Sequence, residues 1–322
     1  VAPSADTTSE ATVARNLVNR LALMPLALIL TPAVVVVVTP LSACTTEPAE
    51  PTYTWHHDIA PIIEKRCANC HLADGIGPFS LTDYASVKKV GSLVKAQVGS
   101  RAMPPWGASS HRKYRFSPAL TDAQVKAVTT WVDEGMAEGA TTDTPAKVED
   151  TSPVLSRSDL TVKMPVVYTP KKEPDDYRCF LLDWPLKEKK FVTGFAAQPG
   201  NTAVVHHIAA YLVNLGNGVD ETTLNELQKL DDKEDGPGYT CFGGPTGDSG
   251  LLIPIQQLAQ WVPGARGTDF PEGTGIEVRP GAKIVLQIHY NTLTAGAQPD
   301  QTSIEMRVDD TVKYPAAFAP WL

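Results

Sequence analysis

Runs of basic residues are absent from this chain, and its formal net charge is -8, with 28 Lys and Arg against 36 Asp and Glu. Both features argue against nucleic-acid binding, because such a surface needs clustered positive charge. There is no internal repeat, which argues against a repeat architecture. Cysteine is scarce, with five in 322 residues. The length favours two domains, and the 27 prolines, which fall mostly outside helix-like segments, favour loops and β structure in the larger one.

The N-terminus resembles an export signal. Arg15 and Arg20 precede an apolar run over residues 21–41, which ends in Leu-Ser-Ala before Cys44. A basic flank, an apolar core and small residues before a cleavage point predict a signal over 1–44. The ending resembles a bacterial lipoprotein box, which predicts lipid on Cys44 and a tether over 45–52. The alternative is an uncleaved membrane helix, since the run is just long enough to span.

Both alternatives place the rest of the chain outside the cytoplasmic membrane. We expect an exported protein that is periplasmic or associated with the outer membrane as a lipoprotein. The valine at position 1 indicates a non-ATG start or a fragment.

Residues 67–71 carry the most specific motif, C-x-x-C-H. The thiols of Cys67 and Cys70 can each form a thioether to a haem vinyl group, and His71 then ligates the iron. A zinc site would need two further ligands nearby, and a thioredoxin-like redox pair belongs in a βαβ unit that the sequence does not indicate. The motif therefore predicts covalent haem c, which is attached outside the cytoplasm.

The segment 53–138 is predicted to fold as a small all-α class I cytochrome c domain of three short helices. Residues 58–66 form the first helix; a valine stripe at 87, 90, 94 and 98 marks the second; a capping box at 121–124 starts the third. Met103, in a loop stiffened by two prolines, is the predicted sixth iron ligand. Met136 is the competitor, and His111 would give a bis-histidine haem instead.

Residues 139–159 have no apolar periodicity and are predicted to be a linker. The segment 160–322 is predicted to be an all-β sandwich, jelly-roll-like, with a helical surface excursion over 217–236. The expected strands cover 160–164, 177–184, 191–197, 203–213, 275–279 and 283–291.

The histidines of this second segment are His206, His207 and His289. Three imidazoles without thiolate or carboxylate suit copper, or else zinc. Neighbouring residues of an ideal strand point to opposite faces, so His206 and His207 can share one metal only if the strand twists or bulges, or if the rings use different nitrogens. Spacing alone leaves open that one histidine packs in the core and the other is exposed.

A family resemblance favours the metal. The stretch 175–309 resembles the N-terminal half of the copper type II, ascorbate-dependent monooxygenase core, the family of peptidylglycine α-hydroxylating and dopamine β-monooxygenases. The family's Val-His-His-hydrophobic strand matches 205–208, its Leu-Gln-Val-His-Tyr strand matches 286–290, and its linking segment matches 261–263 and 271–275. The segment 53–138 is similar to the haem domain found ahead of such copper domains in some bacterial proteins, with Gly77-Pro78-Phe79 and Met103 to Trp106 in the same order.

The resemblance implies several features of the chain. It implies copper held by His206, His207 and His289, and a disulfide between Cys179 and Cys241, which an oxidising compartment permits. The alternative for these two cysteines is a pair of buried free thiols. In the family the tri-histidine copper relays electrons, and a second copper, held by a His-x-His pair and a methionine, binds oxygen and substrate.

This sequence has no His-x-His, and Met306 is expected to be an ordinary strand residue. No catalytic residue can therefore be assigned. Either a second copper domain follows Leu322 in a longer chain, or this protein keeps only the relay half.

The expected function is an exported, monooxygenase-like oxidoreductase in which haem relays electrons to the tri-histidine copper. Its partners would be a periplasmic electron donor or small reductant, molecular oxygen and a small organic substrate, with a membrane reached through the lipid anchor. Two alternatives stay open: an electron-transfer lipoprotein with one haem and one copper but no oxygenase activity, and a copper-binding or sensing module.

Overall fold

The computed structural model describes residues 50–108, 114, 117–148, 152–216 and 218–317. The predicted signal over 1–44, with Cys44, and the alternative iron ligand His111 lie outside the described residues. Within the described ranges, no helix is both long and apolar enough to cross a bilayer.

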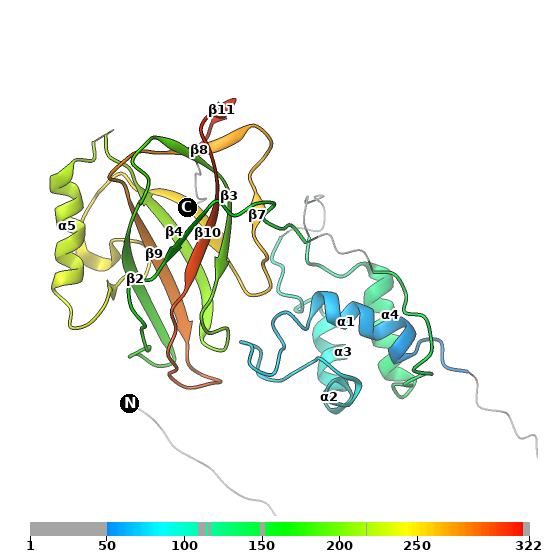
Figure 1. Ribbon diagram of the computed structural model, residues 1–322. Helices are drawn as coiled ribbons and strands as arrows, with labels where there is room; N and C mark the ends of the chain where they lie inside the picture. The colour runs from blue at the N-terminus through cyan, green and yellow to red at the C-terminus, as the bar shows by residue number, and fades with distance from the viewer. Residues whose placement is uncertain (1–49, 109–113, 115–116, 149–151, 217, 318–322) are drawn as a thin grey trace, which may run out of the picture. The chain divides into compact units, whose positions relative to one another are not determined.

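Short helices make up the first part of the described chain (Figure 1). They are a π-helical turn η1 (Trp55–Ile59), α1 (Ala60–Arg66), α2 (Tyr84–Lys89), α3 (Gly91–Gly99) and α4 (Asp122–Asp133). Helix α4 begins at the predicted capping box: the Thr121 hydroxyl accepts from the Gln124 amide at 3.2 Å, and the Thr121 amide donates to the Gln124 side chain at 3.0 Å. A cap of this kind stabilises a helix by about 1 kcal/mol.

The valine stripe was predicted to be one helix, and this prediction was wrong. The helix is interrupted at Val90, whose φ of -116° lies outside the helical region, so α2 and α3 are separate elements. Val87, Val94 and Val98 are still buried in the common core. Gly91 starts α3 where the Met136 sulfur packs closely against it, and a side chain at this position would collide with that sulfur.

The core of the helical part is aromatic and aliphatic. Trp55 and Trp131 pack with ring centroids 5.9 Å apart, and Ile59 and Val128 are fully buried beside them. The Trp131 indole donates to the Ala137 carbonyl at 2.8 Å, so its polar atom is satisfied. The described residues of the helical part thus form four short α-helices and a π-helical turn where three helices were expected, and the cytochrome c fold stays a prediction.

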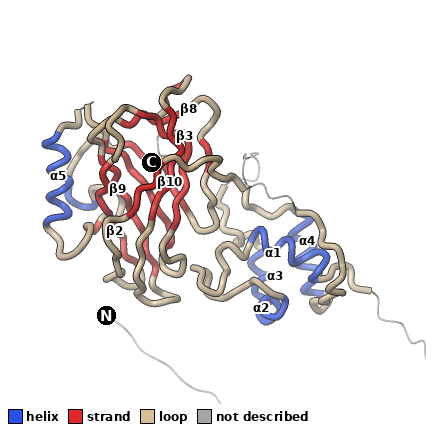
Figure 2. The backbone as a smooth tube through the Cα atoms, in the orientation of Figure 1, coloured by secondary structure: helices blue, strands red, loops and turns tan. Residues whose placement is uncertain are grey.

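Two antiparallel-rich sheets form the second part (Figure 2). The first sheet has the order β1-β10-β3-β8-β11, with β7 also paired to β3, and the second has the order β5-β2-β9-β4-β6. The strands are β1 (Leu160–Lys163), β2 (Asp175–Asp183), β3 (Lys190–Gln198), β4 (Val205–Val213), β5 (Tyr239–Thr240), β6 (Gln256–Trp261), β7 (Thr268–Asp269), β8 (Thr274–Val278), β9 (Lys283–Asn291), β10 (Ser303–Asp309) and β11 (Tyr314–Pro315). A short 3₁₀ turn η2 (Gly247–Ser249) lies between β5 and β6. The β-rich, sandwich-like architecture was predicted correctly.

Every second side chain of a strand points between the sheets, and these side chains form the core. On β9, Ile284, Leu286, Ile288 and Tyr290 belong to this core together with residues of β3 and β10. Since successive strand residues point to opposite faces, the odd-numbered residues of β9, including His289, lie on the other face of the sheet. The strand pattern therefore places His289 outside the inter-sheet core.

Several strands were not predicted. The sequence of β6 begins with two glutamines, and β5, β7 and β11 are two residues each, too short for a periodic signal. Met306 was predicted to be an ordinary strand residue, and it is: it lies in β10, fully buried between the sheets.

The predicted excursion contains helix α5 (Glu221–Asp232). Leu227 is fully buried and packs with Val213 of β4 and Val285 of β9, so α5 covers the outer face of the second sheet (Figure 1). The segment between the helical and β-rich parts contains one isolated bridge, at Val154, among its described residues. The exact domain boundaries stay predictions.

Candidate metal centre

The three histidines of the β-rich part come together on neighbouring strands. In the register of β4 and β9, His207 lies opposite His289, and Val205 lies opposite Tyr290. Between these two pairs, β4 has one residue more than β9. His206 is this extra residue, and it forms a β-bulge. The bulge turns His206 toward the same side as His207, which is the distortion predicted for two adjacent histidines that share a metal.

The ring nitrogens converge. The Nδ1 atom of His207 lies 3.2 Å from Nδ1 of His289 and 3.4 Å from Nδ1 of His206. Two nitrogens bound to one ion at about 2.0 Å with a tetrahedral angle are about 3.3 Å apart. Within the described part of the chain, these histidines form the one group of three or more His, Cys, Asp or Glu close enough to hold a metal ion. The donor set and its spacing fit copper.

The three rings differ in exposure. His289 is buried, His207 is half-buried and His206 is exposed. Burial, together with the neighbouring His289 and His206, lowers the pKa of His207 to about 4, and burial also lowers the pKa of His289. Both imidazoles are therefore neutral at pH 7, with a lone pair free for a metal. The site is closed on the β9 side and open to solvent at His206.

Sequence reasoning missed two residues next to His289. Tyr177, on β2, lies opposite His289 and stacks on its ring with centroids 4.0 Å apart and an interplanar angle of 6°. The carboxylate of Asp175 lies 2.8 Å from His289 Nε2 and accepts a second hydrogen bond from Asn291. These hydrogen bonds hold the pKa of the Asp175 carboxyl below its usual range, and the bond from Asn291 contributes most. The alternation of Asp175, Tyr177 and Cys179 puts them on one face, but only the register of β2 with β9 reveals the partner.

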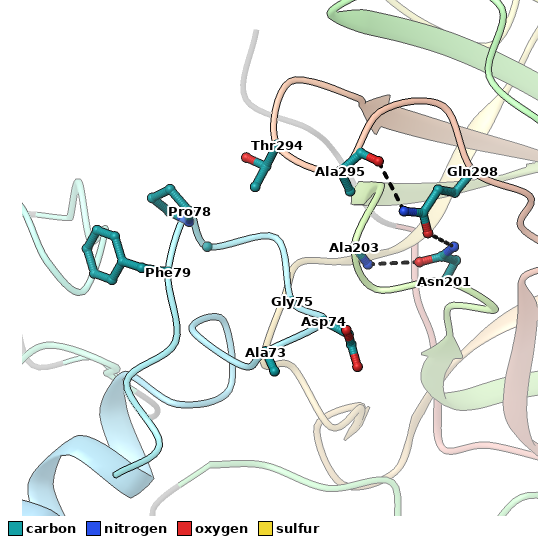
Figure 3. A pocket seen from close by; sticks show the side chains of 11 residues that line it. Ala73, Asp74, Gly75, Pro78, Phe79, Asn201, Ala203, Thr294, Ala295 and Gln298 are labelled. Atoms are coloured by element: carbon teal, nitrogen blue, oxygen red, sulfur yellow. Dashed lines mark hydrogen bonds between the residues drawn. The ribbon is translucent and has the colours of Figure 1, made fainter. Parts of the chain in front are cut away.

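Loops at one end of the sheet link the two histidine strands. The Asn201 side chain donates to Gln298 at 3.1 Å, and Gln298 donates to the Ala295 carbonyl at 3.0 Å (Figure 3). Asn201 also accepts from the Ala203 amide at 3.0 Å, just ahead of β4. The loop entering β4 is thereby tied to the loop that follows β9. These loops line a cavity of about 300 Å³, together with residues of 73–79.

A disulfide joins Cys179 of β2 to Cys241, the pairing that the family resemblance implied. Gln287, two residues before His289, donates to the Cys241 carbonyl at 2.6 Å. The next residue, Phe242, packs edge-on against Tyr177 with centroids 4.9 Å apart. The disulfide therefore fixes the loop whose aromatic residue supports the Tyr177–His289 stack.

Removing this bridge is expected to lower stability. The cysteines are 62 residues apart in sequence, and closing a loop of this length in the unfolded chain corresponds to about 4 kcal/mol. A Cys179→Ala, Cys241→Ala double variant should lower the free energy of unfolding by roughly that amount, as measured by urea denaturation. A loss below about 1 kcal/mol would contradict the chain-entropy estimate. Wild type measured with and without a reductant provides the control.

The C-x-x-C-H motif lies at the end of α1. Cys67 caps that helix, and neither Cys67 nor Cys70 is in a disulfide. Burial, with a smaller contribution from Cys70, raises the pKa of Cys67 to about 12, whereas redox-active cysteine pairs have lowered values. No third metal-binding side chain gathers with this pair in the described part of the chain. Both observations disfavour a redox pair and a zinc site.

The His71 ring is held by a hydrogen bond from its Nδ1 atom. Its Nδ1 donates to the Phe79 carbonyl at 3.0 Å, which leaves Nε2 with a free lone pair. Gly77 permits this approach, because a Cβ there would lie 2.7 Å from Nδ1. The Gly77-Pro78-Phe79 segment, noted in the sequence only as part of a resemblance, therefore positions the imidazole.

Met103 lines a cavity of about 910 Å³ in the helical part. Ile62 and Arg66 of α1, the helix that ends at Cys67, line it as well, whereas Cys67, Cys70 and His71 are not among its described lining residues. The competitor Met136 is instead packed against Gly91. The donor chemistry of the motif suits a haem, but the cavity is not lined by the motif, so the haem site stays a prediction; Met103 lines this cavity and Met136 does not.

The comparison with known proteins bears on the β-rich part. No curated protein matches the chain. The resemblance of residues 53–138 to a cytochrome c domain stays a prediction. Residues 160–296 match the model of the copper type II ascorbate-dependent monooxygenase N-terminal domain, so this part of the chain is similar to that domain.

Proposed function

We propose that this chain is an exported copper oxidoreductase of the monooxygenase-like type, with haem c in residues 53–138 as the source of electrons for copper at His206, His207 and His289. The observation that carries the proposal is the convergence of three Nδ1 atoms on the monooxygenase-like sandwich. Bound copper would supply one-electron chemistry between Cu(II) and Cu(I).

The residues around the histidines have separable tasks. His207 and His289 are at least half-buried on their strands and offer neutral imidazoles. Tyr177 holds the plane of His289 by stacking. His206, the exposed ligand on the bulge, faces solvent, where a small reductant or a partner protein can approach.

The haem site is proposed at Cys67, Cys70, His71 and Met103. The bound group would supply one-electron iron chemistry at a potential raised by a methionine ligand. The Thr202 hydroxyl donates to the Asp74 carbonyl at 3.1 Å, which connects the segment after the haem motif to the loop four residues ahead of His206.

A second candidate is an electron-transfer lipoprotein with one haem, one copper and no oxygenase activity. The three histidines that gather within the described residues can hold the one copper that this function requires. A copper-binding or sensing module is the third candidate.

We further propose that the protein is exported to the periplasm or, through lipid on Cys44, to the outer membrane. Its partner would be a periplasmic electron donor or a small reductant. If it is an oxygenase, it would also use molecular oxygen and a small organic substrate.

The test measures copper and haem per chain in protein exported to the periplasm, and then the reoxidation of the reduced haem with and without copper. We expect one copper for each haem, and faster reoxidation when copper is present. A protein that takes up no copper would overturn the proposal. Copper uptake without any change in reoxidation would leave the binding or sensing module, and copper-dependent reoxidation without substrate oxygenation would leave the electron-transfer lipoprotein.

A further inference from the structure

Asp175 makes a direct contact with the most buried of the three histidines. Its Oδ1 lies 2.8 Å from His289 Nε2 and accepts from Asn291 Nδ2 at 2.9 Å. The His289 side chain is 7% exposed, whereas that of Asp175 is 44% exposed. A buried ring is thus linked through its far nitrogen to a carboxylate at the edge of the sheet.

The partners fix the tautomer of His289. A carboxylate can only accept a hydrogen bond, so Nε2 must carry the proton, and Nδ1 keeps its lone pair. That Nδ1 atom is the one that lies 3.2 Å from His207 Nδ1. The hydrogen bond alone would let the His289 ring rotate about the Nε2–Oδ1 direction. The stacked ring of Tyr177, which is nearly parallel to it, limits this rotation.

The other two histidines lack this support. Among the residues that the structure describes, His289 is the one histidine of the three whose second ring nitrogen is hydrogen-bonded to a carboxylate. The orientation of His289 on β9 is therefore fixed by its own hydrogen bond, whereas the orientations of His206 and His207 on β4 depend on the bulge.

We propose that Asp175 is a positioning residue that sets the tautomer and orientation of His289, so that Nδ1 is presented to the metal before it binds. This inference rests on the proposed function, since it assigns a role at the same copper site. Carboxylate partners of metal-binding histidines act in this way generally, and their removal weakens metal binding about 10- to 100-fold.

The strand offers a matched control. Asp183 lies at the other end of β2, its side chain is 81% exposed, and it pairs with Lys283. Asp175→Ala and Asp183→Ala therefore each remove one carboxylate from the same strand, but only the first touches a histidine. Asp175→Asn keeps an acceptor oxygen without the charge, and serves as the conservative rescue.

Two readouts test the proposal in the full chain. Copper affinity, measured by competition with a chelator, should fall about 10- to 100-fold in Asp175→Ala, less in Asp175→Asn, and not at all in Asp183→Ala. Long-range ¹H–¹⁵N NMR spectra of the metal-free protein should show His289 protonated at Nε2 in wild type and in Asp175→Asn, and a mixture of tautomers in Asp175→Ala.

The outcomes separate this inference from the proposed function. Two results would overturn the role of Asp175 and leave copper binding intact. One is a wild-type His289 that is protonated at Nδ1. The other is a copper affinity of Asp175→Ala within about twofold of that of Asp183→Ala, which is well below the usual effect. A wild-type protein that binds no copper would overturn the proposed function, and the metal-free NMR spectra would then decide the tautomer by themselves. Thermal melts of each variant identify any loss of folding.

Discussion

Replacing His289 by alanine is expected to reduce the copper bound per chain from one to close to zero. His289 is the ligand held from both sides, by Tyr177 and by Asp175, and its Nδ1 faces His207. Its loss leaves two imidazoles, one of them on an exposed bulge, and water would have to replace the third donor. Elemental analysis after dialysis against a weak chelator measures the effect, and copper-dependent reoxidation of the haem should disappear with it.

Two further variants make this result interpretable. His206→Ala removes an exposed ligand and so should lose copper without disturbing the core. His57→Ala removes a histidine whose side chain is 50% exposed and which pairs with Asp58 in η1, and it should keep one copper. A His289→Ala protein that still binds one copper as tightly as wild type would rule out the tri-histidine site.

The second large effect is expected at the C-x-x-C-H motif. A Cys67→Ala, Cys70→Ala double variant should carry no covalently attached haem, because a thioether requires a cysteine sulfur for each vinyl group. The test is export in a host that attaches haem c, followed by a denaturing gel stained for haem. We expect a stained band of the full chain in wild type and no stained band in the double variant.

The matching control removes the same number of sulfur atoms. A Cys179→Ser, Cys241→Ser variant loses the disulfide of the β-rich part but keeps the motif, so it should retain covalent haem wherever the protein is recovered. Wild-type protein without covalent haem under these conditions would contradict the haem assignment and, with it, the relay. The copper prediction at His289 would be unaffected.

Short-range patterns carried most of what could be predicted. The capping box at Thr121 starts α4, as predicted, and the strands around His206 and His289 are those that the alternation indicated. Such features depend on residues within a few positions of one another, so the sequence contains all that is needed. The prediction of one helix from the valine stripe failed because Val90 leaves the helical region, next to Gly91, which packs against Met136 from 45 residues further along the chain.

By itself, the sequence determined the chemistry of the two candidate sites: the thiols and imidazole of residues 67–71, and three histidines in apolar strands. Only the tertiary structure decided how the histidines meet. The bulge at His206 follows from the register of β4 with β9, and the contact of Asp175 with His289 joins residues 114 positions apart. Register is set by burial summed along whole strands, and a shift of one residue would turn every side chain to the other face, so no local pattern encodes it.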